Sequence, residues 1–230
     1  MDRLNIQPYW NVLTIEAQAL YERLARLPFI SEFYLAGGTG LALQLGHRLS
    51  VDFDLFGDSR ESVGQDQRQI ILENLSDDPS LKIVWDKDGT FSAHWRGVGI
   101  SFFRLNRHPL ALPPLQIAGI RVAVVEEIGA MKLAAIISRG AKKDYIDLYF
   151  ILQHTSLERL FEISAIKYPY NPSFPVMAVR ALAFFEDAEA DPMPQMIVSV
   201  DWQKIKAILE KQALDMGRRQ TELEKLWDQR

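Results

Sequence analysis

Apolar and polar positions follow different periods in the two halves of the chain. In the first half, short apolar or alternating runs predict strands over residues 33–36, 81–85, 90–95, 98–105 and 120–125. In the second half, apolar residues recur at helical spacing and predict helices over residues 126–138, 142–153, 157–168, 176–185 and 202–227. We therefore expect an α+β protein, in which a mixed-sheet head (residues 1–125) precedes a C-terminal helical region (residues 126–230).

Helices and turns separate the strands of the first half. Apolar residues at helical spacing predict helices over residues 15–27, 41–45 and 68–75. An Asp-Gly turn within residues 86–89 is expected to join two strands into a hairpin. Residues 110–115 are expected to form a loop, because prolines stand within them and beside them.

Two carboxylates stand two positions apart on a further strand, which follows the helix over residues 41–45. Side chains two apart on a strand point to one face, so Asp52 and Asp54 are expected side by side, with Phe53 turned toward the core. Neighbouring carboxylates repel each other unless a cation lies between them, and their hard oxygens suit magnesium. The sequence thus favours a metal site at Asp52 and Asp54; the alternative is a pair that merely faces solvent.

A glycine turn lies between the first strand and the helix that follows it. Gly37, Gly38 and Thr39 stand at the expected N-terminus of this helix, where backbone N–H groups and the helix dipole favour a phosphate. Gly38 would allow the backbone to approach a triphosphate closely, and Thr39 would add a hydroxyl donor. Most Gly-Gly pairs are ordinary turns, so the position just before the acidic strand is what makes this pair a candidate.

The connection between this helix and the acidic strand carries three polar residues. His47, Arg48 and Ser50 fill it, and they allow two interpretations. In one, Arg48 reaches the phosphates of a substrate. In the other, His47 and Arg48 fix the loop through hydrogen bonds.

Composition limits the class of protein. The chain has 230 residues, a formal net charge of -4 and no cysteine, so disulfides and thiolate metal sites are excluded. The N-terminal residues lack the apolar core of a signal peptide, and no run approaches the ~20 apolar residues of a membrane helix. A cytoplasmic protein without a membrane partner is the expectation.

The order Gly-Gly-Thr, then Gly-His-Arg-x-Ser-x-Asp-x-Asp-x-Phe, resembles the AbiEii/AbiGii toxin family of the DNA polymerase β-like nucleotidyltransferase superfamily. The resemblance implies a polymerase β-like head and transfer of a nucleoside monophosphate from an NTP, with two Mg²⁺ ions at the acids. It also implies the toxin of a toxin–antitoxin or phage-defence pair, with an antitoxin as partner. Some relatives modify the acceptor end of tRNA, so RNA is the preferred acceptor.

A second block, from Lys132 to Asp147, resembles the Lys…Arg…Lys/Arg-Asp-x-x-Asp-Leu segment of the same family. By this resemblance Lys132 and Asp147 belong to the nucleotide site as catalytic residues, with Asp144 and Arg139 as possible support. The residues themselves leave alternatives open. Lys132 lies among apolar residues, so it either extends to solvent or points at an anion. For Asp144 and Asp147 the alternative is a charge at a helix N-terminus that pairs with Arg139 or Lys143. A structural salt bridge from Asp144 to Arg139 is expected, whereas Asp147 is expected to face inward.

One departure from the superfamily keeps other functions open. The strand over residues 100–105 carries no third carboxylate, so either a helix residue such as Asp147 replaces it or two acids hold the metal. The alternatives are transfer to a hydroxyl of a protein or small molecule, and a catalytically silent binding module. The basic residues allow two interpretations: they form a surface that binds RNA, or they are scattered and simply face solvent. The residues are Arg96, Arg104, Arg107, His108, Arg121, Lys142 and Lys143.

Overall fold

The computed structural model describes residues 7–228, and the side chains of residues 7–218. The chain forms two compact units, Met1–Ile128 and Gly129–Arg230. The division falls inside helix α4 (Val125–Arg139), whereas the sequence predicts it after residue 125.

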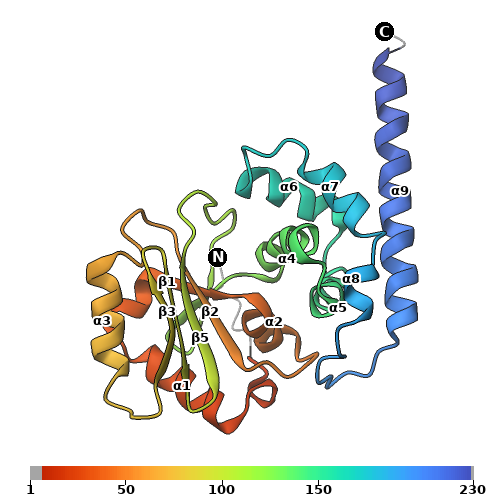
Figure 1. Ribbon diagram of the computed structural model, residues 1–230. Helices are drawn as coiled ribbons and strands as arrows, with labels where there is room; N and C mark the ends of the chain where they lie inside the picture. Colours follow the sequence, from red (N-terminus) through yellow and green to blue (C-terminus); the bar gives the residue numbers. More distant parts are fainter. Residues whose placement is uncertain (1–6, 229–230) are drawn as a thin grey trace. The chain divides into compact units, whose positions relative to one another are not determined.

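A mixed sheet forms the frame of the first unit (Figure 1). The described residues give it seven strands in the order β3-β4-β5-β2-β1-β7-β6. Their bounds are β1 (Phe33–Ala36), β2 (Asp52–Gly57), β3 (Lys82–Lys87), β4 (Thr90–Trp95), β5 (Val98–Arg104), β6 (Leu115–Ile117) and β7 (Ile120–Val122). Strand β2 lies at the centre of the sheet, antiparallel to β1 and parallel to β5.

Helices cover the sheet of the first unit, with α1 and α3 on one side and α2 on the other (Figure 1). Their bounds are α1 (Ile15–Ala25), α2 (Gly37–Leu45) and α3 (Gln65–Leu75), and short 3-10 turns occupy Trp10–Val12 and Pro28–Glu32. Helix α1 begins where the sequence predicts it, because the Thr14 hydroxyl accepts a hydrogen bond from the backbone N–H of Ala17 at 3.2 Å.

The core of the first unit lies between the sheet and helices α1 and α3. Leu20 of α1 and Ile71 of α3 are fully buried there and belong to one apolar cluster. The cluster also contains the fully buried Phe33 of β1, Phe91 of β4 and Phe102 of β5. The rings of Phe33 and Phe102 meet edge to face, with centroids 5.0 Å apart. Phe53 joins the same cluster, so the residue between the two acids packs inward as the alternation predicts.

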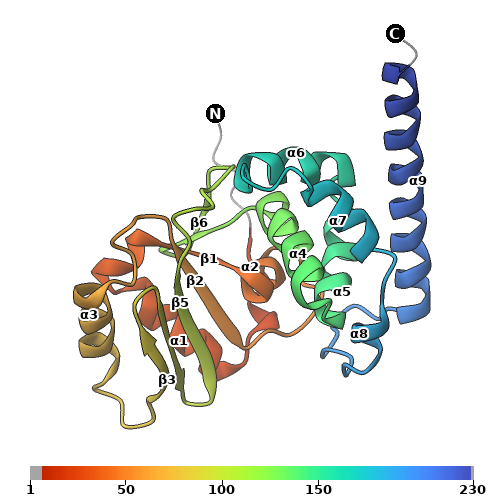
Figure 2. The same ribbon diagram turned by 45° about the horizontal axis from the view of Figure 1, so that its top comes forward.

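The second unit is helical (Figure 2). After α4 come α5 (Lys142–Ile151), α6 (Leu157–Lys167), α7 (Phe174–Ala181), α8 (Glu186–Glu189) and α9 (Trp202–Asp228). Close packing of α6 on α4 depends on Gly129, because a Cβ at this position would lie 2.6 Å from a methyl group of Leu160. Among the described residues no helix is both long and apolar enough to cross a membrane.

Two differences from the predicted elements have physical causes. Helix α2 begins at Gly37, so the glycines form its first turn instead of a separate loop before it. Strand β6 falls at the end of the predicted loop, where only pairing with β7 through the Ala118-Gly119 turn makes it a strand. Such pairing depends on distant partners, which a local pattern does not contain.

Candidate active site

Asp52 and Asp54 open the central strand β2 and share one face of it. The burial along β2 alternates: Asp52 is exposed, Phe53 is buried and Asp54 is half-buried. This alternation agrees with the strand periodicity from which the pair was predicted. The two carboxylates therefore stand on the side of β2 that is opposite to the Phe53 core.

Each of the two carboxylates lies against a glycine of a different neighbour. A Cβ on Gly37, which begins α2 directly after β1, would lie 2.6 Å from Oδ2 of Asp54. A Cβ on Gly99, the β5 residue opposite Asp52, would lie 2.5 Å from Oδ1 of Asp52. Both acids thus occupy space that exists only because the neighbouring residue has no side chain.

The N-terminus of α2 faces the acidic strand. Its first residue, Gly37, has φ +64°, a left-handed conformation that favours glycine. Ala36, the residue before it, makes no side-chain cap, and the first backbone N–H groups of a helix have no partner within the helix itself. Because Asp54 lies against Gly37, the positive end of the helix dipole stabilises its carboxylate and would equally attract a phosphate.

Arg48 lies over Gly38. A Cβ on Gly38 would clash with Nη2 of Arg48 and lie 3.2 Å from its Cζ and 3.3 Å from Oγ of Ser50. Nη1 of Arg48 donates to the carbonyl oxygen of Leu49 at 3.1 Å, and the residue is only 5% exposed. Arg48 therefore donates a hydrogen bond within its own connection and lies directly beside the N-terminus of α2, and both interpretations of its role stay predictions.

Thr39 ties the glycine turn to the acidic strand. Its hydroxyl donates to Oγ of Ser50 at 2.7 Å or to the backbone carbonyl of Asp52, and the residue is 1% exposed. The Thr39 hydroxyl was predicted to donate to a phosphate, but it already donates to a partner inside the protein. His47 is fully buried as well, which places it in the packing of the connection.

The second predicted block forms a buried ion-pair cluster within the helical unit. Nζ of Lys132 lies 2.8 Å from Oδ1 of Asp144 and 2.6 Å from Oδ2 of Asp147. Arg139 adds a bidentate contact to Asp144, at 2.8 and 3.1 Å. The side chains of both aspartates are fully buried and that of Lys132 nearly so, whereas the Arg139 side chain is 57% exposed.

The charges of this cluster hold each other ionised. Burial by itself lowers the pKa of Lys132, but the carboxylates of Asp147 and Asp144 outweigh it, so the pKa is raised above its ordinary value. Burial by itself raises the pKa of Asp144, but the Lys132 ammonium and the Arg139 guanidinium outweigh it and lower the pKa. The predicted Asp144–Arg139 salt bridge is confirmed.

The structure thus gathers the predicted site residues into two groups. The first unit brings together the acids of β2, the first turn of α2 and the connection between them: Gly37, Gly38, Thr39, His47, Arg48, Ser50, Asp52 and Asp54. The second unit brings together Lys132, Arg139, Asp144 and Asp147. That Lys132 and Asp147 contribute to the nucleotide site stays a prediction.

The donor set at β2 suits a metal shared with substrate. Within the described residues, no group of three or more His, Cys, Asp or Glu is placed to hold a metal ion. Two carboxylates alone are what magnesium commonly takes from a protein when phosphate oxygens of a substrate complete its shell. Asp52 and Asp54 fit this requirement, since both lie on one strand face and Asp52 is open to solvent.

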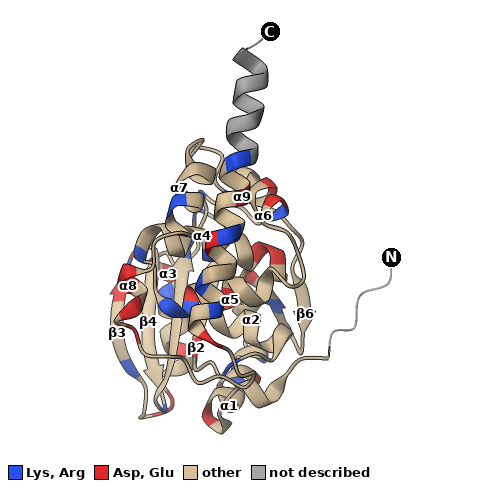
Figure 3. Cartoon of the chain, turned by 90° about the vertical axis from the view of Figure 1, so that its right-hand side faces the viewer, with Lys and Arg blue, Asp and Glu red and all other residues tan. Residues whose placement is uncertain are grey.

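Basic and acidic residues are interspersed over the described elements (Figure 3). Several of the cations that were candidates for an RNA surface have partners inside the chain. Arg104 makes a bidentate pair with Asp88 at 2.8 and 2.6 Å, and Arg96 pairs with Asp78 at 2.9 Å. Lys142 donates to the backbone carbonyl of Asp191. The charges of these residues are therefore accounted for by partners within the chain and need no RNA to explain them.

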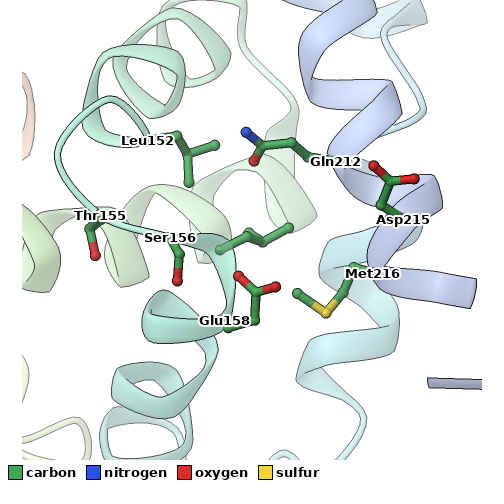
Figure 4. Close-up of a pocket in the computed structure, with 8 residues that line it drawn as sticks. Leu152, Thr155, Ser156, Glu158, Gln212, Asp215 and Met216 are labelled. Carbon is green, nitrogen blue, oxygen red and sulfur yellow. The ribbon is translucent and has the colours of Figure 1, made fainter. Parts of the chain in front are cut away.

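A separate hollow of about 250 Å³ lies within the helical unit (Figure 4). Residues at the N-terminus of α6 and on α9 line it, among them Glu158, Gln212 and Asp215. Both carboxylates there are exposed and belong to no metal-ligand cluster among the described residues. The hollow therefore does not compete with the β2 face as a site of phosphate chemistry.

Sequence reasoning missed Gly99. Glycine inside a strand is a weak signal, because it marks a bulge, a bend or a close approach without saying which. Only the register of β2 and β5 shows that this glycine stands opposite Asp52.

Known proteins match both units of the chain. The model of a family described as "Nucleotidyl transferase AbiEii toxin, Type IV TA system" matches residues 18–104 and 96–228. An uncharacterised protein of Aquifex aeolicus (strain VF5) is 32% identical over 180 residues, which cover 76% of this chain and 84% of that protein.

Solved structures share the fold. MenT4, a nucleotidyltransferase toxin of Mycobacterium tuberculosis H37Rv, has a TM-score of 0.59 and 18% identity over 89% of this chain and 86% of its own. The antibiotic-resistance factor ANT(2'')-Ia, in complex with adenylyl-2''-tobramycin, has a TM-score of 0.51 and 14% identity over 68% of this chain and 99% of its own. These likenesses confirm the predicted fold class, a mixed-sheet head followed by helices.

Proposed function

This chain belongs to the AbiEii family of nucleotidyltransferase toxins, and from that premise we propose that it transfers a nucleoside monophosphate from an NTP to RNA, with Mg²⁺ held by Asp52 and Asp54. The family establishes the coarser activity: the protein is a nucleotidyltransferase toxin of a type IV toxin–antitoxin system, which has an antitoxin as partner. The metal, the acceptor and the residues are the proposal. The placement of two carboxylates on one face of β2, beside the N-terminus of α2, carries it.

The proposed reaction is an in-line displacement at the α-phosphorus of the NTP. A hydroxyl oxygen of the acceptor forms the new P–O bond, its proton passes to a base or to water, and pyrophosphate leaves with the electrons of the broken bond. Mg²⁺ would neutralise the charge that develops on the phosphoryl oxygens. Asp52 and Asp54 would hold the cation, while the N–H groups at the start of α2 would orient a phosphate.

Arg48 and the Lys132 cluster take supporting roles in this proposal. Arg48, fixed beside Gly38 and Ser50, adds positive potential where the triphosphate would lie. From the family resemblance we also propose that Lys132 and Asp147 contribute to nucleotide binding. Their mutual ion pair supports a role of Lys132 in holding the Asp147 carboxylate in one position.

RNA is the preferred acceptor, and tRNA in particular, because some relatives in this toxin family modify its acceptor end. Among the basic candidates, Arg107 and Lys143 are exposed, and Arg96 is exposed while it pairs with Asp78. Phosphate contacts from such residues would give affinity without reading sequence. A hydroxyl of a protein or small molecule is the alternative acceptor, and a silent binding module is the alternative to catalysis.

A transfer assay tests the proposal. The full-length protein is incubated with Mg²⁺, each of the four α-labelled NTPs and total tRNA, and in parallel with protein and small-molecule fractions of a cell extract. We expect label in tRNA, pyrophosphate release, and neither in the Asp52→Ala/Asp54→Ala variant. Label in another fraction would replace the acceptor. Absence of label from every fraction, or equal labelling by the double variant, would overturn the proposed mechanism.

A further inference from the structure

Gly99 stands beside the acidic pair and belongs to none of the motifs from which the site was predicted. It is the second residue of β5, and the parallel register of β2 and β5 places it directly opposite Asp52. Side chains at paired positions of neighbouring strands point to the same face of the sheet. A side chain at residue 99 would therefore enter the face that carries both carboxylates.

The Asp52 carboxylate fills the space that a side chain at residue 99 would need. A Cβ on Gly99 would lie 2.5 Å from Oδ1 and 3.3 Å from Cγ of Asp52, both closer than ordinary van der Waals contact. The two atoms are the far end of a flexible, exposed side chain, so the chain would yield by moving the carboxylate and not by rearranging backbone. The absence of a side chain at Gly99 therefore affects the position of the Asp52 carboxylate more than it affects the fold.

Gly97, two residues earlier, provides a contrast within the same hairpin. Its φ is +84°, and a Cβ there would meet no atom within 4 Å. Gly97 is required by the backbone conformation of the turn, whereas Gly99 has no such conformational requirement. In a strand, glycine is otherwise unfavourable relative to alanine, so its presence at residue 99 is explained by the close approach of Asp52.

We infer that Gly99 is a positioning residue, which leaves the Asp52 carboxylate the room it needs to bind the divalent cation of the nucleotidyl-transfer site. The inference rests on the proposed function of Asp52 and Asp54. It adds that metal binding depends on Gly99 of β5, although glycine has no side-chain atom that could bind the metal. Residues that orient a metal ligand typically change metal affinity by about 10- to 100-fold when they are altered.

The experiment compares Gly99→Ala with Gly97→Ala as its matched control. Mn²⁺ binding in the presence of a non-hydrolysable NTP is measured by calorimetry, and thermal unfolding is measured on the same samples. For Gly99→Ala we expect Mn²⁺ binding to weaken by about 10- to 100-fold with an unchanged or higher Tm. For Gly97→Ala we expect the reverse: unchanged Mn²⁺ affinity and a lower Tm, because alanine is strained at φ +84°.

A second background shows whether Gly99 acts through Asp52. In the Asp52→Ala protein the clash partner is gone, so adding Gly99→Ala should change residual Mn²⁺ binding no further. Unchanged affinity in the single Gly99→Ala variant, or an equal further loss in the Asp52→Ala background, would overturn the inference. If the wild-type protein and Asp52→Ala bind Mn²⁺ alike, the proposed function itself fails, which is a distinct outcome.

Discussion

The two acidic pairs of this chain differ in what surrounds them. On β2, Asp52 is exposed and Asp54 half-buried, and each lies against a glycine. On α5, Asp144 and Asp147 are fully buried, and both contact the ammonium group of Lys132. Spacing and residue type are similar, so the difference lies in burial and in the cation each pair can reach.

This difference separates two uses of a carboxylate. A buried pair must bring its own counter-charge, since an isolated ion inside a protein costs several kcal/mol. The α5 pair does so through Lys132 and Arg139, so we expect removal of its cation to destabilise the helical unit, whatever part Lys132 and Asp147 also take in nucleotide binding. A pair that stays open to solvent can take its cation together with a substrate, which is the role proposed for Asp52 and Asp54.

The largest expected effect is the loss of nucleotide transfer when the solvent-accessible pair, Asp52 and Asp54, loses one of its charges. Asp54→Asn keeps the size of the side chain against Gly37 but removes the charge, and we expect kcat for nucleotide transfer to fall by on the order of 10³-fold. Asp58→Asn, at an exposed acid just after β2, is the matched control and should keep wild-type kcat. Equal rates for the two variants would remove the distinction between Asp54 and an ordinary surface acid.

The buried pair should respond in stability. Lys132→Met leaves two buried carboxylates without their shared cation, and we expect the free energy of unfolding to fall by about 3–5 kcal/mol. Arg139→Met removes a cation whose side chain is 57% exposed, so a loss below about 1 kcal/mol is expected from the same denaturant titration. A loss no greater for Lys132→Met than for Arg139→Met would show that burial does not set the difference.

The pH dependence of stability should report the same cluster. The pKa of Asp144 is lowered in the folded protein, so its contribution is complete above the unfolded value of about 4 and is lost as the pH falls through the folded value. The pKa of Lys132 is raised, so its contribution is complete below the unfolded value of about 10 and is lost as the pH rises through the folded value.

Denaturant unfolding at a series of pH values measures this dependence. We expect Asp144 to add a slope of at most about 1.4 kcal/mol per pH unit on the acid side. Asp144→Asn should lack that part of the slope, while Asp54→Asn should keep it. An identical acid limb in wild type and Asp144→Asn would contradict the assignment.

The smallest effect expected concerns the link between α2 and β2. Thr39→Val removes the hydroxyl that joins Ser50 and the Asp52 carbonyl, and we expect a loss of about 1 kcal/mol in the free energy of unfolding. Ser50→Ala removes only one of these partners and should cost less in the same titration. Transfer activity should fall in Thr39→Val at temperatures where the protein remains folded, because the glycine turn would no longer be held against the acidic strand.

Local patterns in the sequence were sufficient for most of the elements, though not for β6 or the first turn of α2, and for the direction in which the acidic pair faces. Alternation about Phe53 predicts which way Asp52 and Asp54 face, and the apolar surroundings of Lys132 mark it as an unusual cation. These features depend on neighbours within a few residues, so a single chain is enough to read them.

Contacts between distant segments could not be predicted in the same way. The close contact of Asp52 with Gly99 depends on the register of β2 with β5. The close contact of Arg48 with Gly38 depends on how the loop between α2 and β2 folds back over α2. The double contact of Lys132 depends on the packing of α4 against α5. Each of these arises from tertiary structure, which leaves no fixed spacing in the sequence.

The most direct measurement is electron paramagnetic resonance of Mn²⁺ added to the full-length protein with a non-hydrolysable NTP. We expect wild type to hold Mn²⁺ and the NTP together, Asp144→Asn to do so at temperatures where it is folded, and Asp52→Ala/Asp54→Ala to lose the bound Mn²⁺ signal. A double variant that binds Mn²⁺ with the affinity of wild type would contradict the claim that the open acidic pair on β2 holds the cation.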